Sequence, residues 1–288
     1  MKLNGLHILL TYQCTLECEH CFVWGGPRQD GTFTLELIET VLGQAREAQV
    51  EWIYFEGGEP FLFYALLVES VKIAAGMGFH VGIVTNAYWA ISVPDAVECL
   101  KPLAAVEDLS ISTDLFHCAE ALGELPQNAA AAAHWLHIPT EFISINRPTV
   151  HGADGGEVMF RGRAASLLAN HAPQQPWRVF DRCTNEDLRD PGRVHVDSFG
   201  NVHICQGLVI GNIFETPLPA LCTTFDPSMH SICGPLLEGG PAALASEYGV
   251  LRAETFADAC HLCYETRCAI RARFPRVLAP DQMYGAVS

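Results

Sequence analysis

Basic residues are scarce in this 288-residue chain, which carries 17 Lys and Arg against 33 Asp and Glu and has a formal net charge of -16 at pH 7. Nucleic-acid binding depends on clustered Lys and Arg that neutralise phosphates. The same shortage disfavours binding to an anionic membrane surface. We therefore expect neither a nucleic acid nor a membrane as a partner.

Long hydrophobic runs are also missing. Residues 1–10 hold a single Lys and an apolar stretch far shorter than the ~20 residues that a membrane span needs, and they lack a small-residue cleavage site. No segment is polar enough to predict long disorder, and 49% hydrophobic residues are typical of a globular protein. We expect a cytoplasmic protein that folds along its whole length.

Cysteine, in contrast, is abundant, with twelve in the chain. In a reducing cytosol, metal or cluster ligation explains so many thiols better than disulfides do, although Cys is also a common buried residue. Cys99 lies in a predicted helix between apolar neighbours, and we expect it to be a packing residue. The spacing of the others must decide their role.

Short apolar strands alternate with helices over the first half of the chain. The predicted strands are residues 6–11, 52–55, 80–84, 109–112 and 141–145, and the predicted helices are residues 34–49, 61–75, 94–103 and 127–137. This α/β alternation predicts a parallel sheet covered by helices. A sixth repeat near Trp177–Phe180 would make a partial (βα)6 TIM-like barrel, which we favour over a flat sheet. In either architecture, functional groups lie at the C-terminal ends of the strands.

The βα rhythm stops near residue 175, where a cysteine-bearing region with short strands and Pro/Gly-rich turns begins. Residues 193–197 and 201–205 flank Ser198-Phe-Gly200 and predict a β-hairpin. We therefore expect a barrel core at residues 1–175 and a small cysteine-rich module at residues 176–288.

Cys14-Thr-Leu-Glu-Cys18-Glu-His-Cys21 follows the first predicted strand. Thiolates are the soft ligands that iron-sulfur clusters and zinc prefer, but zinc usually takes four protein ligands and this loop offers three thiols. Three thiolates would leave one iron of a four-iron cluster open. A zinc site completed by His20 or a distant Cys, or a trio of buried thiols, is the alternative.

The CxxxCxxC loop resembles that of the radical S-adenosylmethionine (radical SAM) superfamily, and Gly57-Gly58-Glu59-Pro60 after the second strand is similar to that family's glycine-rich motif. The resemblance implies a 4Fe-4S cluster on the three cysteines that cleaves S-adenosylmethionine (SAM) reductively to a 5′-deoxyadenosyl radical. Glycines let the backbone approach SAM closely, and Glu59 could accept a hydrogen bond from its ammonium group.

Further polar residues stand at strand ends, where the resemblance implies contact with SAM or substrate. They are Thr85, Asn86, Ser110, Ser112, Asn146 and Arg147. Each could instead be an ordinary turn or cap residue. Past the fourth strand, Asp114, His117 and Cys118 are candidate catalytic residues, because a His could relay a proton and a Cys could donate hydrogen to a carbon radical. Capping and packing are the competing interpretations for all three.

The later motifs resemble the auxiliary-cluster extension of the same superfamily, called SPASM or, when shorter, Twitch. They are Arg161-Gly-Arg-Ala164, Cys183, Gly200-Asn-Val-His-Ile-Cys205, Gly211-Asn-Ile213, Cys260-His-Leu-Cys263 and Cys268. No Cys follows Cys268, so we expect one auxiliary 4Fe-4S cluster rather than two. Its predicted ligands are Cys183, Cys205, Cys260 and Cys263, with Cys268 as a competitor or additional ligand and Cys222 and Cys233 outside the set. A four-thiolate zinc site is the alternative.

The resemblance covers most of the chain and implies an enzyme that abstracts hydrogen from a substrate and oxidises or rearranges it. A peptide and a small metabolite both remain open as substrates, because no separate leader-peptide-binding domain is expected before the first strand. The electron donor would be of the flavodoxin or ferredoxin type. The alternative is a non-catalytic zinc or iron-sulfur protein, which explains the cysteines but not Gly57–Pro60.

Overall fold

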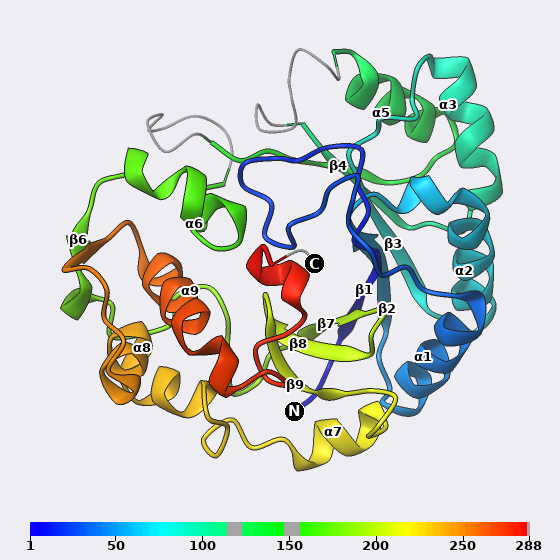
Figure 1. The fold of residues 1–288 in the computed structure, drawn as a ribbon. Helices are drawn as coiled ribbons and strands as arrows, with labels where there is room; N and C mark the ends of the chain where they lie inside the picture. The colour runs from blue at the N-terminus through cyan, green and yellow to red at the C-terminus, as the bar shows by residue number, and fades with distance from the viewer. Residues whose placement is uncertain (114–122, 147–155, 287–288) are drawn as a thin grey trace.

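Five parallel strands and their covering helices form the first half of the protein. The computed structural model describes residues 1–113, 123–146 and 156–286. The strands are β1 (Gly5–Thr11), β2 (Trp52–Gly57), β3 (His80–Thr85), β4 (Asp108–Ser112) and β5 (Thr140–Ile143), and they pair in this order. The helices α1 (Leu35–Glu47), α2 (Tyr64–Gly76), α3 (Val93–Leu100) and α5 (Leu125–Trp135) follow one another outside the strands (Figure 1). The predicted α/β class with a parallel sheet is confirmed.

Local sequence signals explain where the helices begin. Thr34 caps α1, because its side chain accepts a hydrogen bond from the backbone N–H of Leu37 at 3.3 Å. Ser92 caps α3 in the same way through the N–H of Asp95, with Pro94 in the first turn. The apolar side of α1, which includes Ile38 and Leu42, is fully buried against the sheet in the main hydrophobic core.

The predicted sixth repeat is wrong. Trp177–Val179 is a 3₁₀ turn rather than a strand, and β6 (Gln175–Pro176) is a two-residue strand paired with β10 (Thr255–Phe256). Pro176 has no N–H for a sheet ladder, and the N–H of Phe180 bonds back to the carbonyl of Trp177 at 3.2 Å. The apolar side chains of this segment therefore belong to a turn.

The sheet continues instead on the other side of β1. There β7 (Arg193–Asp197) runs parallel to β1, and β8 (Asn201–Cys205) and β9 (Leu208–Asn212) follow antiparallel, giving the order β5-β4-β3-β2-β1-β7-β8-β9. The predicted hairpin has the expected bounds. Asp197 shapes its turn by accepting hydrogen bonds from the N–H groups of Phe199 and Asn201.

The remaining helices pack beyond this hairpin. They are α6 (Arg163–Leu167), α7 (Leu218–Thr224), α8 (Cys233–Tyr248), which is kinked at Gly239 and Gly240, and α9 (Ala259–Ile270). A second hydrophobic cluster lies between α8, α9 and the hairpin, with Ile204, Leu244 and Ile270 among its members, whereas Leu218 and Leu221 of α7 belong to the main core. The division at residue 175 stays a prediction, since the sheet itself is continuous through the β1–β7 pairing. Within the described residues, no helix is long and apolar enough to cross a membrane.

Candidate metal and cofactor sites

The cysteine loop after β1 opens onto a large cavity. Cys14, Cys18 and Cys21 all line this cavity, which has an empty volume of about 1890 Å³. His20 lines it too, so the loop offers a nitrogen ligand beside its three sulfurs. We call this space the barrel cavity, because its walls come from the ends of β1 to β5 and from β7.

Hydrogen-bond donors point at the sulfurs of Cys14 and Cys21. The backbone N–H of Gly25 lies 3.2 Å from Cys21 Sγ, and that of Leu16 lies 3.4 Å from Cys14 Sγ. The side-chain amide of Asn86 is 3.5 Å from Cys14 Sγ. Such donors stabilise a sulfur that carries negative charge. The loop therefore fits a thiolate-ligated metal centre.

Burial raises the pKa of Cys14 to about 12. The hydrogen bonds from Leu16 and Asn86 lower this pKa but do not offset the effect of burial. A neutral thiol is consequently the resting form of this residue at pH 7. Metal ligation requires the thiolate, so binding of a metal centre at this loop must release the proton.

The segment Arg161-Gly162-Arg163 holds the cysteine loop in place. The Arg163 guanidinium donates hydrogen bonds to the carbonyl oxygens of Cys18 at 2.7 Å and Gly25 at 2.8 Å. The backbone N–H of Arg163 donates to the carbonyl oxygen of Cys21 at 3.0 Å. Gly162 has a φ of +60°, and a Cβ there would lie 2.6 Å from the Cys21 oxygen. This sequence motif suggested only a link to the second module. Its contact with the first loop is tertiary and could not be read from the sequence.

The glycine-rich motif packs against the cysteine loop. A Cβ on Gly58 would lie 2.0 Å from the Gln13 oxygen, and one on Gly57, whose φ is +126°, would lie 2.4 Å from the Thr11 oxygen. Both glycines also line the barrel cavity. The sequence predicted that these glycines let the backbone approach SAM closely. The structure gives a further reason for them, because a side chain at either position would collide with the backbone of the cysteine-loop segment.

The placement of Glu59 differs from the predicted ammonium contact. Its side chain is wholly buried, and Glu59 and Pro60 are not among the residues that line the cavity. The carboxylate accepts hydrogen bonds from Asn86 N–H at 2.8 Å and Thr85 Oγ1 at 2.9 Å, which ties the motif to the end of β3. Burial raises the pKa of Glu59 to about 7, and these hydrogen bonds oppose the rise. Its observed partners make it a positioning residue.

The structure brings four of the predicted strand-end residues to the barrel cavity. Thr85, Asn86, Ser110 and Ser112 line it together with the three cysteines. Asn146 follows β5, where its N–H donates to the Gly156 oxygen, and it is not among the lining residues. Arg147, Asp114, His117 and Cys118 lie outside the described residues.

A second group of cysteines surrounds a smaller cavity in the C-terminal half. Cys183, Cys205, Cys260 and Cys263 line this space, which has an empty volume of about 460 Å³ and which we call the auxiliary cavity. Cys205 ends β8, and Cys260 and Cys263 lie one turn apart on α9. The four predicted ligands therefore line one cavity.

Four further cysteines of the described residues do not line the auxiliary cavity. Cys268, farther along α9, is not among its lining residues, and Cys233 is fully buried in the second hydrophobic cluster. Cys222 packs on the main core, where its carbonyl accepts a hydrogen bond from the N-terminal amine, and Cys99 packs on that core as well. Of the described cysteines, only the predicted four line the auxiliary cavity. Burial raises the pKa of Cys233, and Cys183, Cys205 and Cys263 lie close enough to it for their charges to raise its pKa further.

Arg161 lies between the two cavities and lines both. Its Nη1 is 3.1 Å from Glu186 Oε1 and 3.2 Å from Cys205 Sγ, and its guanidinium lies 5.4 Å from the ring centre of Phe22, the residue after Cys21. Burial lowers the pKa of Arg161, but the neighbouring cysteines and Glu186 raise it above its ordinary value overall. A permanent positive charge therefore separates the two cysteine groups.

Residues 8–118 match the family model of the radical SAM superfamily. YydG of Bacillus subtilis (strain 168), named for peptide biosynthesis, is 28% identical over 113 residues, which cover 38% of this chain and 35% of YydG. GTP 3′,8-cyclase of Pelotomaculum thermopropionicum is 27% identical over 183 residues, which cover 60% of this chain and 53% of that protein. The chain thus spans about half or less of the length of these relatives.

A solved structure supports the fold over nearly the whole chain. The structure "Native anSMEcpe with bound AdoMet and Cp18Cys peptide" aligns with a TM-score of 0.51 and 13% sequence identity, and the alignment covers 95% of this chain and 98% of that one. At this identity the likeness concerns the fold alone.

Proposed function

We propose that this protein is an enzyme that cleaves SAM reductively and abstracts hydrogen from a substrate, because residues 8–118 match the family model of the radical SAM superfamily. The observation that carries the proposal is the barrel cavity, where Cys14, Cys18 and Cys21 meet the glycines of the second motif. The radical SAM superfamily uses a 4Fe-4S cluster and SAM. A non-catalytic zinc protein would need the thiols but gives no reason for the cavity beside them.

The residues of this chain would divide the work in the following way. Cys14, Cys18 and Cys21 would ligate three irons and leave the fourth open toward the cavity. The bound cluster and SAM would together supply the 5′-deoxyadenosyl radical. Arg163 keeps the loop in shape through its contacts with Cys18 and Gly25. Ser110 and Ser112, at the end of β4, would orient SAM or substrate from the opposite wall.

We further propose a peptide as the substrate. A nucleoside triphosphate would need free cationic side chains, yet the two arginines among the described lining residues, Arg161 and Arg193, lie 3.1 Å and 3.9 Å from Glu186. The names of YydG and of the anSMEcpe complex, which mention peptides, point the same way.

The auxiliary cavity would hold a second 4Fe-4S cluster on Cys183, Cys205, Cys260 and Cys263. Four thiolates would ligate all four irons, which favours electron transfer over substrate ligation. Arg161 beside Cys205 would stabilise the extra negative charge of a reduced cluster. A cytoplasmic location and a flavodoxin or ferredoxin-type donor complete the proposal.

The decisive experiment is anaerobic reconstitution with iron and sulfide, followed by incubation with SAM and dithionite. We expect cluster binding and release of 5′-deoxyadenosine, both abolished at the first site when Cys14, Cys18 and Cys21 are replaced by Ala. Cys99→Ala is the matched control, because Cys99 packs on the main core away from both cavities. A protein that binds only zinc, or that never forms 5′-deoxyadenosine, would show that the proposal is wrong.

A further inference from the structure

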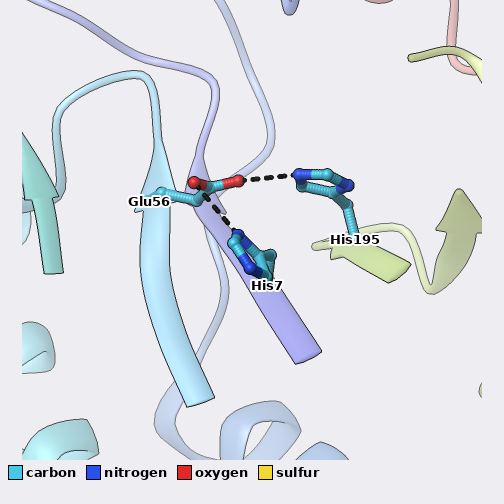
Figure 2. A group of neighbouring side chains, drawn as sticks. All are labelled: His7, Glu56 and His195. Carbon is cyan, nitrogen blue, oxygen red and sulfur yellow. Dashed lines mark ion pairs between the residues drawn. The ribbon is translucent and has the colours of Figure 1, made fainter. Parts of the chain in front are cut away.

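Three metal-ligating side chains meet on the wall of the barrel cavity, apart from the cysteines. They are His7 of β1, Glu56 of β2 and His195 of β7, and Figure 2 shows the carboxylate between the two imidazoles. The three strands are neighbours in the sheet, in the order β2-β1-β7. His7 is directly paired with His195, and Glu56 is paired with Leu9, two residues along β1. All three side chains therefore leave the same face of the sheet.

Their ligand atoms are close enough for one ion. Glu56 Oε2 lies 3.3 Å from His7 Nδ1, Glu56 Oε1 lies 3.0 Å from His195 Nε2, and the ligand atoms of all three residues lie within 4.8 Å of one another. Metal bonds to imidazole and carboxylate are about 2.0–2.2 Å long, so atoms that share an ion lie about 3 to 3.5 Å apart. Only a small closing of the two imidazoles is needed.

The ion pairs of this cluster leave two polar atoms available to an ion. His7 Nδ1 and Glu56 Oε1 each lack a partner that meets the angles of a regular hydrogen bond, although both have short contacts. An ion between the three side chains would use both atoms as ligands. The cluster is also shielded, because the three side chains are only 12% to 17% exposed.

The surroundings hold the imidazole rings in place. His7 stacks on Tyr54 with ring centres 4.7 Å apart, and Tyr54 in turn donates a hydrogen bond to Asp108 at 2.9 Å. His195 meets the ring of Phe22 edge to face at 6.1 Å. Fixed rings lower the entropy that binding an ion would cost, as supporting contacts do at metal sites generally.

We propose that His7, Glu56 and His195 bind a divalent first-row transition metal ion such as Mn²⁺, Fe²⁺ or Zn²⁺. Two imidazoles and a carboxylate suit these ions, and three protein ligands leave coordination positions open. Because the three residues line the barrel cavity, the open positions face the space in which substrate would lie. The site is separate from both cysteine groups and does not depend on SAM cleavage.

The test is a Mn²⁺ titration of the anaerobically reconstituted protein, with free Mn²⁺ counted by its electron paramagnetic resonance signal. Mn²⁺ prefers oxygen and nitrogen to thiolate ligands, so it does not compete for the cysteines. We expect one saturable site per chain. Glu56→Gln and His195→Gln should each weaken binding at least about tenfold, and added Zn²⁺ should displace the bound Mn²⁺.

His80→Gln is the matched control, because it removes a similar His–carboxylate contact, 2.9 Å from Glu107, that lies half exposed outside the cavity. It should leave Mn²⁺ affinity unchanged. Iron content and the thermal unfolding temperature report whether each variant is folded, and Glu56→Gln conserves shape if His195→Gln does not fold. Absence of saturable binding up to millimolar Mn²⁺, or unchanged affinity in a folded Glu56→Gln protein, would overturn the proposal. Formation of 5′-deoxyadenosine, measured separately, tests the proposed function.

Discussion

The two cysteine groups are assembled in opposite ways. Cys14, Cys18 and Cys21 fall within one eight-residue loop and open onto a cavity of about 1890 Å³. The auxiliary group gathers four cysteines from a loop, a strand and a helix around a cavity of about 460 Å³. A local loop with three ligands leaves space for another molecule, whereas four ligands from separate elements enclose a site. Under the proposed function, the first group is the place of reaction and the second stores or transfers electrons.

The largest expected difference is between single cysteine substitutions in the two groups. Cys14→Ala should abolish 5′-deoxyadenosine formation, because the first cluster would lose one of only three ligands. Cys205→Ala should lower the iron content by the amount held in one 4Fe-4S cluster and still permit SAM cleavage. Iron analysis and chromatography of the nucleoside product measure both effects. Equal loss of SAM cleavage in the two variants would break the division of roles.

A side chain added at Gly58, which lies against the cysteine loop, should have the next largest effect, a loss of stability. Gly58→Ala places a Cβ 2.0 Å from the Gln13 oxygen and should cost about 3 kcal/mol or more, since backbone must move to relieve the contact. Gly43→Ala in α1 is the control, because a Cβ there meets nothing within 4 Å and should stabilise the helix by about 0.5–1 kcal/mol. Urea unfolding measures both values. Equal effects would mean that the loop contact is unimportant.

Glu59 should make the stability of the metal-free protein depend on pH. Burial raises its pKa to about 7 from an ordinary value near 4.5, so the folded protein binds the proton more tightly than the unfolded chain does. The free energy of unfolding should therefore fall as pH rises from 4.5 to 7, by up to about 3 kcal/mol from this group. Urea unfolding of the metal-free protein should show this slope, and Glu59→Gln should lack it. A slope that persists in the variant would assign it to another group.

The smallest expected effect concerns the charge between the two sites. Arg161→Met removes the cation 3.2 Å from Cys205 Sγ, so the reduction potential of the auxiliary cluster should fall by on the order of 60 mV, a tenfold change for one electron. Spectroscopic redox titration measures the shift, and uncoupled SAM cleavage should persist. Arg178→Met, at an exposed arginine whose guanidinium lies over Trp177, is the control. Identical potentials in the two variants would contradict the assigned role of Arg161.

Several features followed directly from local sequence. The strand and helix periods placed β1 to β5 and their helices, and the Ser198-Phe-Gly200 turn fixed the bounds of β7 and β8. The CxxxCxxC spacing predicted a shared site because ligands so close in sequence cannot lie far apart. The 3₁₀ turn at Trp177–Val179 was missed because its apolar side chains resemble those of a strand, while its hydrogen bonds close a turn.

Only the tertiary structure decided which distant residues meet. Nothing in the sequence brings His195 to His7 and Glu56, because that contact depends on β7 pairing with β1 instead of following β5. The burial of Glu59 and the clamp of Arg163 on the cysteine loop are likewise contacts between separate elements. A sequence specifies periodicity and short-range spacing, which act within an element. Strand order, register and burial arise from the free energy of the whole chain, and these determined the composition of the candidate metal site.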